Sequence, residues 1–368
     1  MARPRNQELR EFLLGTLAHS PANVAVNAAK RFGISRASVN GYLRALVDEG
    51  LIEATGRTNA RSYRLKALDT YEETFPISPE LKEDVVLRER VSPHLRNLPG
   101  NVEHICDYGF TEMLNNAIEH SEGTLCKIRL SRNYSIVSLD LIDNGVGIFN
   151  KIARECHLAD KRQAILELSK GKLTTDSRNH SGEGIFFTSR MFDSFSIMSG
   201  ELRYGRTKQD NDEWLVESSL QKRLAAMQLG EEFARGTWVA MKIPTNAKQT
   251  AKEVFDEFVD DDARFSRTHV PLTLAKYEGE NLVSRSQARR LLERVDRFSE
   301  VMLDFRGIAE IGQAFADEIF RVWAREHPRV KIVPENASPG VERMIRHASA
   351  NAAEDSAAAA ASKSSSKS

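Results

Sequence analysis

Hydrophobic positions near the N-terminus recur with a helical period. Apolar residues spaced three to four positions apart predict a helix over residues 7–18, and a second helix is expected over residues 22–32. Gly33 follows at a tight turn, and Ser35 can cap a third helix that extends to Leu46. The start of the chain is therefore expected to be a small helical unit.

Two short strand-like runs follow this helical pattern. They cover residues 51–55 and 62–65, and the polar stretch between them contains Gly56, Arg57 and Arg61. The pattern predicts a β-hairpin with a basic tip.

A helix, a glycine-containing turn, a helix and a hairpin together resemble a winged helix-turn-helix domain over residues 1–66. The resemblance implies double-stranded DNA as a partner, because side chains on the third helix and the hairpin can reach base edges and phosphates. Those candidates are Arg36, Ser38, Asn40 and Arg44 on the helix, with Arg57 and Arg61 on the hairpin. A small helical domain used for protein contact or dimerisation is the alternative.

The charge distribution favours DNA over that alternative. Residues 1–66 carry eleven Lys or Arg against five Asp or Glu, a net charge of +6, whereas the whole chain balances 52 against 52. A local positive surface binds phosphate backbones because it releases counterions from them.

A further helical pattern, over residues 110–121, separates apolar from polar positions. The apolar side comprises Phe110, Met113, Leu114, Ala117 and Ile118. The polar side comprises Glu112, Asn116, Glu119 and His120. A solvated surface helix has the same pattern, so the segments that follow decide between the two interpretations.

Three glycine-containing segments come next along the chain. Their notable residues are Asp143, Gly145 and Gly147 after a strand-like run, Gly182 and Gly184 before an apolar helix, and Thr237 at the start of another strand. Backbone N–H groups at the N-terminus of a helix have no partner within the helix and can donate hydrogen bonds to a phosphate. Each segment has an ordinary structural explanation when it is taken alone.

Taken together and in this order, the helix and the three segments closely resemble the GHKL ATPase superfamily of gyrase, histidine-kinase and MutL-type proteins. The resemblance covers residues 101–245 and implies an α/β sandwich that holds ATP and Mg²⁺ between helices and sheet. It implies that Asn116 is a ligand of Mg²⁺ and that Glu112, one turn earlier, polarises the attacking nucleophile. Glu119, on the same polar side, is included with the nucleotide-binding residues.

The resemblance also assigns the remaining positions. Asp143 matches the carboxylate that accepts a hydrogen bond from the adenine amino group, and Thr237 matches the threonine that supports it. The resemblance implies that the backbone comes close to the base at Gly145 and Gly147. It implies that the backbone cradles phosphate at Gly182 and Gly184. Residues 150–181 match the ATP lid, in which Lys170 or Lys172 can contact the γ-phosphate. A basic surface turn is the alternative there.

The last part of the chain alternates strand and helix patterns again. Residues 269–348 resemble the STAS-like domain of unknown function that is found downstream of such ATPases and is related to anti-sigma-factor antagonists. In those antagonists a serine after the Asp-Phe strand is phosphorylated, but Gly312 and Gln313 stand in that neighbourhood here. The resemblance implies a protein partner for this domain and puts a phospho-acceptor role in doubt.

Three segments are expected to connect or extend these domains. They are a proline-marked linker over residues 67–100, an acidic helical linker over residues 246–268, and a tail of Ala, Ser and Lys over residues 349–368. The tail is expected to be disordered, because it has no apolar surface to offset the entropy of ordering.

Composition narrows the class of protein further. Apolar residues make up 41% of the chain and charged residues 28%, enough to build buried cores. Three cysteines without a close pair provide neither a disulfide framework nor a zinc spacing, so a reducing cytoplasm is expected. No apolar run approaches the ~20 residues that cross a bilayer, and no membrane partner is expected.

The sequence thus predicts a multidomain α+β protein with a winged helix-turn-helix domain, a GHKL α/β sandwich and a STAS-like α/β domain. The expected function is a cytoplasmic, DNA-binding transcriptional regulator that binds ATP, hydrolyses it slowly and is switched by its nucleotide state. A protein-serine kinase resembling the anti-sigma-factor kinases is the alternative. A switch that holds ATP without turnover is a third interpretation, and a homodimer is compatible with each.

Overall fold

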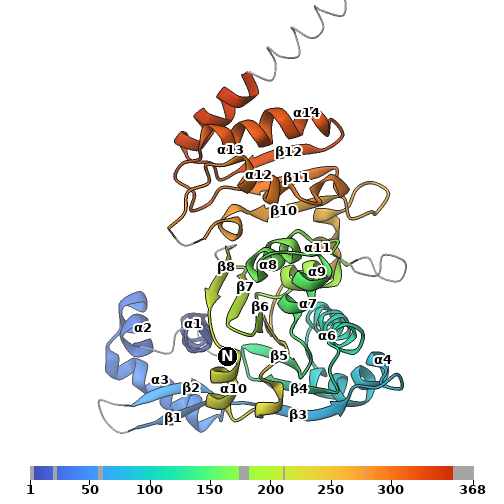
Figure 1. Cartoon of the computed structure of the whole chain (residues 1–368). Helices are drawn as coiled ribbons and strands as arrows, with labels where there is room; N and C mark the ends of the chain where they lie inside the picture. The colour runs from blue at the N-terminus through green and yellow to red at the C-terminus, as the bar shows by residue number, and fades with distance from the viewer. Residues whose placement is uncertain are drawn as a thin grey trace, which may run out of the picture.

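The chain is a mixed α+β protein with three units along its length (Figure 1). The computed structural model describes residues 4–19, 23–56, 61–173, 182–209, 212–277 and 279–350. We call residues 4–66 the N-terminal unit, residues 67–266 the middle unit and residues 267–350 the C-terminal unit. Within the described ranges, no helix combines the length and the apolar character needed to cross a membrane.

Three helices and a hairpin form the N-terminal unit. These elements are α1 (Pro4–His19), α2 (Val24–Phe32), α3 (Arg36–Asp48), β1 (Ile52–Thr55) and β2 (Ser62–Leu65). Gly33 ends α2 with a left-handed φ of 61°, and the Ser35 side chain accepts a hydrogen bond from the Ser38 N–H at the start of α3. A separate apolar core that includes Leu13 and Leu43 holds the helices together. The helices and the hairpin predicted for this region are confirmed.

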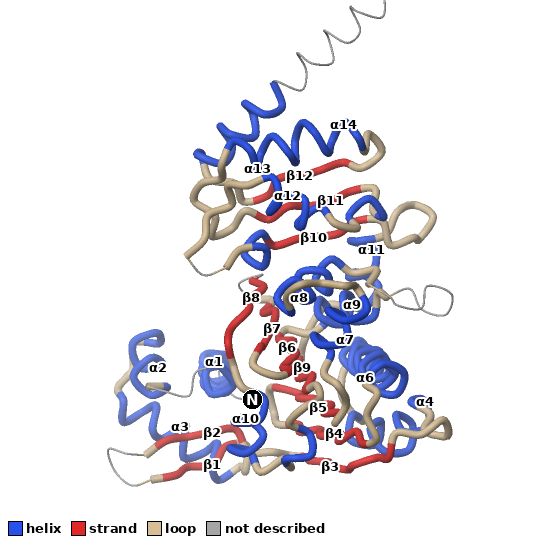
Figure 2. Tube along the Cα trace, viewed as in Figure 1, coloured by secondary structure: helices blue, strands red, loops and turns tan. Residues whose placement is uncertain are grey.

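A seven-stranded antiparallel sheet forms the centre of the middle unit. Its strands, in spatial order, are β3 (Asp69–Pro76), β4 (Leu125–Arg132), β5 (Ile136–Asp143), β9 (Trp238–Pro244), β6 (Ser194–Ser199), β7 (Leu202–Thr207) and β8 (Asp212–Glu217). Alternate residues of β4 are buried, because successive side chains point to opposite faces of a strand. Figure 2 shows this sheet and the smaller C-terminal sheet as separate layers.

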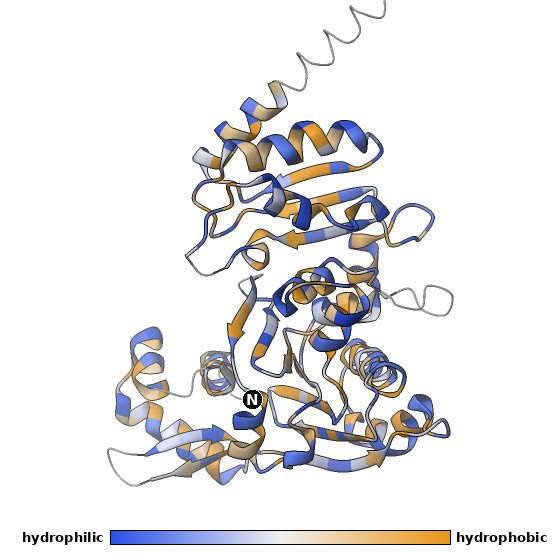
Figure 3. Ribbon diagram, in the orientation of Figure 1, coloured by the Kyte–Doolittle hydropathy of each residue, from blue (hydrophilic) through white to orange (hydrophobic). Residues whose placement is uncertain are grey.

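Helices pack against the middle sheet to build the core. They are α6 (Gly100–His120), α7 (Ile148–Glu155), α8 (Lys161–Lys170), α9 (Gly184–Met191) and α11 (Ala251–Phe258), with α10 (Leu220–Met227) and η3 (Glu231–Phe233) around a second cluster. The apolar side predicted for α6 is buried in the core, including Phe110 and Leu114. Hydrophobic and hydrophilic residues alternate around the helices, as expected for helices with one buried face (Figure 3).

The segment expected to be a linker, residues 67–100, is instead part of the middle unit. β3 pairs with β4 along its whole length, and α4 (Glu83–Val86), η2 (Leu87–Val91) and α5 (Ser92–Leu95) follow it. Val91 and Leu95 are fully buried. β3 is an edge strand whose positions are half-buried or exposed, which explains why its sequence is more polar than that of a central strand.

A three-stranded parallel sheet with flanking helices forms the C-terminal unit. The strands are β10 (Arg267–Pro271), β11 (Glu300–Asp304) and β12 (Lys331–Glu335), and the helical elements are η4 (Leu272–Ala275), α12 (Arg285–Leu292), η5 (Val295–Arg297), α13 (Gln313–Asp317), η6 (Glu318–Trp323) and α14 (Ala324–Glu326). Residues 339–350 are helical, and the predicted disorder of the tail falls largely on residues 351–368, outside the described residues.

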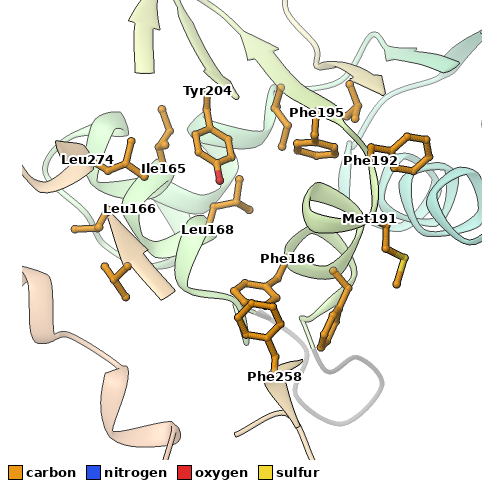
Figure 4. Close-up of a cluster of buried hydrophobic side chains, with 14 of the residues drawn as sticks. Ile165, Leu166, Leu168, Phe186, Met191, Phe192, Phe195, Tyr204, Phe258 and Leu274 are labelled. Carbon is orange, nitrogen blue, oxygen red and sulfur yellow. The ribbon is translucent and has the colours of Figure 1, made fainter. Parts of the chain in front are cut away.

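The middle and C-terminal units share one apolar core. Phe258 and Phe265, from the expected linker over residues 246–268, both pack against Phe186 of α9, with ring centroids 5.0 and 4.6 Å away. Figure 4 shows Phe186 and Phe258 in contact within this cluster. The acidic segment therefore contributes to the core where a linker was expected.

A buried ion pair anchors α9 to β7 and β8. Arg190 Nη2 lies 3.2 Å from the Glu213 carboxylate, and the two side chains are only 4% and 2% exposed. The Tyr204 hydroxyl donates a hydrogen bond to the same carboxylate at 2.7 Å. Burial lowers the pKa of Arg190 to about 10, which leaves the guanidinium charged at neutral pH.

Arg190→Met should lower the free energy of unfolding by up to about 3–5 kcal/mol, because it removes the closer of the two cations beside the buried Glu213 carboxylate and leaves only Arg206, whose Nε lies 3.9 Å away. Adding Glu213→Gln should recover much of this loss. Urea denaturation measures both variants beside Lys252→Met, which removes an exposed ion pair with Asp256 and should cost less than about 1 kcal/mol. Equal losses for Arg190→Met and Lys252→Met would contradict the anchoring role.

Candidate functional site

A cavity of about 310 Å³ lies between α6, α7 and the middle sheet. We call it the α6–α7 cavity. Seven of the candidate site residues line it: Glu112, Asn116, Glu119, Asp143, Gly182, Gly184 and Thr237. His120, on the same polar side of α6, lines it as well. They come from distant parts of the chain, so the fold gathers polar groups that the sequence separates.

The polar side of α6 faces this cavity. Glu112 and Asn116 lie one helical turn apart on it, while the opposite side of the helix is buried in the core. Asn116 Nδ2 is itself buried and has no hydrogen-bond partner in the described part of the chain. An unpaired buried donor costs free energy, so Asn116 indicates a ligand that supplies an acceptor.

Asp143 lies at the end of β5, where this strand pairs with β9. Its Oδ1 accepts hydrogen bonds from the N–H groups of Gly145, at 2.8 Å, and Thr237, at 3.2 Å. Only 7% of the residue is exposed, and burial raises the pKa of its carboxyl to about 6 against the effect of these hydrogen bonds. A carboxylate held in this way suits a ligand that donates a hydrogen bond.

Close backbone approach explains two of the glycines. A Cβ on Gly145 would lie 2.0 Å from the Ser121 carbonyl oxygen, so a larger residue would push the turn away from α6. A Cβ on Gly184 would lie 1.9 Å from a carboxylate oxygen of Glu112. The Glu112 carboxylate therefore lies against the first residue of α9, where a helix N-terminus attracts negative charge.

Gly145 and Gly147 form the turn from β5 into α7 and do not line the α6–α7 cavity. The Thr237 hydroxyl accepts a hydrogen bond from the N–H of Ile148, at 3.0 Å, at the start of α7. Thr237 therefore joins the start of β9 both to Asp143 and to α7.

The structure does not bring Lys170 and Lys172 to the cavity, which differs from the expected γ-phosphate contact. The Lys170 side chain is 2% exposed and its ammonium lies 2.7 Å from the Glu167 carboxylate. Lys172 Nζ donates a hydrogen bond to the Arg297 carbonyl of the C-terminal unit at 2.9 Å. Both ammonium groups are held by partners outside the cavity, which is the physical reason for the difference.

The side chains of α7 that line the cavity were not predicted from the sequence. Lys151 forms ion pairs with Glu155, at 3.5 Å, and with Glu122, at 3.2 Å. The apolar wall comprises Met113, Leu141, Ile148, Ile152, Leu168, Leu173, Ile185 and Val239. The amphipathic pattern of residues 148–155 was the available signal for this wall.

The candidate DNA-binding residues lie on α3 and the hairpin. The exposed ones are Arg36, Ser38, Arg44 and Arg61. Asn40 is half-buried, and Arg57 lies outside the described residues. The Arg61 guanidinium lies 5.5 Å from the centre of the Tyr63 ring, which orients this cation on the hairpin.

Asp143→Asn should stabilise the ligand-free protein at pH 7 to 8. The carboxyl pKa is about 6 in the folded state against an ordinary value of 3.8, so ionisation of Asp143 increasingly destabilises the folded state as the pH rises from 3.8 to 6. Asparagine keeps the acceptor oxygen without the charge. The free energy of unfolding should rise by about 1–3 kcal/mol above pH 6, and the gain should vanish near pH 4.

Urea denaturation across this pH range measures the effect, with the exposed Asp261→Asn as the control. A variant no more stable than the wild type at pH 8 would contradict the assigned burial of the charge.

Comparison with known families identifies one part of the chain. The model of a STAS-like domain of unknown function (DUF4325) matches residues 287–342, from within α12 into the helix at residues 339–350. The expectation of a STAS-like domain is confirmed for these residues. No curated protein matches the chain. The C-terminal unit is therefore similar to a family whose function is itself unknown.

Proposed function

We propose that the α6–α7 cavity binds Mg-ATP and that the chain is a DNA-binding transcriptional regulator switched by its nucleotide state. The observation that carries this proposal is the buried Asp143 carboxylate, which shares one cavity with Glu112, Asn116 and the start of α9. The GHKL-like order of these residues along the sequence supports the same assignment.

The adenine base fits the Asp143 end of the cavity. A carboxylate fixed by the Gly145 and Thr237 N–H groups accepts a hydrogen bond from the exocyclic amino group of adenine. Apolar side chains that line the same cavity, such as Leu141 and Ile152, suit a flat ring. Asp143 therefore supplies the base specificity in this proposal.

The phosphates fit the end of the cavity formed by Gly182 and Gly184. The start of α9 is a helix N-terminus, which attracts anionic groups, and the Glu112 carboxylate lies against its first residue. Among the described residues, no three His, Cys, Asp or Glu side chains gather in a way that could hold a metal ion by themselves. In this proposal Asn116 would help to hold Mg²⁺ through its amide oxygen, and the ion would neutralise phosphate charge.

Glu112 is the group that accepts a proton from an attacking water in this proposal. Its carboxylate lies at the α9 end of the cavity, which is also the proposed phosphate end. Asn116, one turn further along α6, is the metal ligand. The division of roles along one helix predicts different phenotypes for the two positions.

DNA binding is supported by the surface of α3. Arg36, Ser38 and Arg44 are exposed on one helix that follows the tight turn at Gly33. Residues 1–66 carry a net charge of +6, which favours association with a phosphate backbone. The winged helix-turn-helix resemblance assigns α3 to the major groove.

Glu112→Ala should keep Mg-ATP bound but lower the rate of hydrolysis by roughly 10²- to 10⁴-fold, the usual contribution of a general base. Asn116→Ala should lose the Mg²⁺-dependent part of ATP binding itself. Calorimetry measures binding, and release of labelled phosphate from γ-labelled ATP measures turnover. Glu103→Ala, on the same helix but outside the cavity lining, is the control.

Label that appears on the protein instead of as free phosphate would identify the serine-kinase alternative. Undiminished hydrolysis by Glu112→Ala, or equal losses of affinity for both variants, would overturn the division of roles.

Arg36→Ala and Arg44→Ala in the full chain should weaken DNA binding and reduce its dependence on salt. Each phosphate contact that is lost should lower the slope of log K against log salt concentration by about 1. Fluorescence anisotropy with a labelled duplex measures this, with Arg343→Ala, an exposed cation of the C-terminal unit, as the control. Unchanged slopes for the α3 variants would assign the N-terminal unit to protein contact instead.

A further inference from the structure

Lys170 and Lys172 lie where the middle unit meets the C-terminal unit. Both belong to the end of the α7–α8 segment, by which we mean residues 148–173. The sequence offered Lys170 or Lys172 as a contact of the γ-phosphate, with a basic surface turn as the alternative, but the partners of both side chains in the fold indicate another role.

Lys170 bonds to the C-terminal unit on two sides. Its ammonium pairs with Glu167 and donates to the Glu293 carbonyl at 2.8 Å, beyond the end of α12. Its own carbonyl accepts a hydrogen bond from the Thr268 hydroxyl of β10 at 2.7 Å. Both the Lys170 and Glu167 side chains are 2% exposed, so water does not compete for these bonds.

Lys172 and Arg297 exchange hydrogen bonds in both directions. Lys172 Nζ donates to the Arg297 carbonyl at 2.9 Å, and Arg297 Nη1 donates to the Lys172 carbonyl at 3.1 Å. The ammonium also lies 4.6 Å from the centre of the Phe298 ring. Lys172 has a left-handed φ of 54°, a backbone conformation that residues other than glycine rarely adopt. These contacts therefore hold Lys172 in a disfavoured conformation.

The rest of the α7–α8 segment also contacts the C-terminal unit. Arg294 Nη1 donates to the Cys156 sulfur at 3.1 Å, directly after α7. The Tyr277 hydroxyl donates to the Asp160 carboxylate at the start of α8. Leu274 of η4 joins the apolar cluster around α8 (Figure 4).

The same segment forms one wall of the α6–α7 cavity. Leu168 and Leu173 line the cavity, while Lys170 and Lys172 between them bond to the C-terminal unit. Ile148 and Ile152 of α7 line the cavity as well. Neighbouring residues of one short stretch therefore touch both the cavity and the C-terminal unit.

We propose that Lys170 and Lys172 are positioning residues through which the C-terminal unit holds the wall of the nucleotide cavity in its binding-competent arrangement. This inference rests on the proposed function of that cavity. If the wall is already ordered, less of the binding free energy of the nucleotide is lost to ordering it. By linkage, the nucleotide must tighten the contact between the α7–α8 segment and the C-terminal unit to the same extent.

The test uses the full chain and two sets of substitutions. Lys172→Met removes one ammonium and keeps the aliphatic stem, and Lys172→Arg restores a cation that can donate to the same carbonyl. Glu167→Gln combined with Lys170→Met removes the buried pair without leaving one charge alone. Lys331→Met removes a cation of the C-terminal unit that pairs with Glu300, and serves as the matched control.

Calorimetry with Mg-ATP should show about threefold weaker binding for Lys172→Met and about tenfold weaker binding for the double variant. Lys172→Arg and Lys331→Met should bind as the wild type does. In hydrogen exchange, ATP should protect residues 285–298 of the wild-type C-terminal unit, and this protection should fall in Lys172→Met. A purely structural role would leave that ATP-dependent protection unchanged.

Failure of the proposed function is distinguishable from failure of this inference. A wild-type protein that does not bind Mg-ATP contradicts the proposed function. The positioning role is then tested in nucleotide-free protein, where residues 161–173 should exchange faster in Lys172→Met than in the wild type or Lys331→Met. Exchange rates that are the same in all three proteins, or ATP affinities unaffected by both sets of substitutions, would overturn it.

Discussion

The pairing of β5 with β9 is the constraint on which the site depends. The two strands run antiparallel with Ile142 opposite Trp238, and the ladder ends with the Asp143 N–H donating to the Thr237 carbonyl at 2.9 Å. Residues 94 positions apart thereby meet, and the Thr237 N–H can hold the Asp143 carboxylate. Because the Thr237 hydroxyl also fixes the start of α7, the same pairing sets both the floor of the cavity and one of its walls.

The second organising feature is the α7–α8 segment, which belongs to the middle unit, lines its cavity and bonds to the C-terminal unit. One apolar core runs through the middle and C-terminal units, and polar bonds at Lys170 and Lys172 reinforce it. A ligand in the cavity and a partner bound to the C-terminal unit would act on the same short stretch of chain. Communication between them then needs no long pathway, because the stretch contacts both sites directly. The N-terminal unit, in contrast, has a core of its own.

Periodicity was sufficient to predict which side of α6 is buried and which side carries Glu112 and Asn116. It could not identify the partners of the polar residues. Lysines beside a glycine are equally compatible with a phosphate and with backbone carbonyls of another unit, and only the fold brings the Glu293 carbonyl to Lys170. The edge strand β3 was also missed, because its polar, half-buried sequence becomes a strand only through pairing with β4. Local sequence thus indicated the chemistry of the site, whereas long-range contacts determined which groups complete it.

The central claim is that Asp143 makes the cavity specific for adenine. The most direct test is calorimetric titration of the wild-type protein with Mg-ATP and then with Mg-GTP. Adenine presents an amino donor to the carboxylate, whereas guanine presents a carbonyl oxygen at the same ring position and would leave a buried acceptor unpaired. The account predicts that Mg-ATP binds at least about 100-fold more tightly than Mg-GTP. Equal affinities for the two nucleotides, or no binding of Mg-ATP, would contradict it.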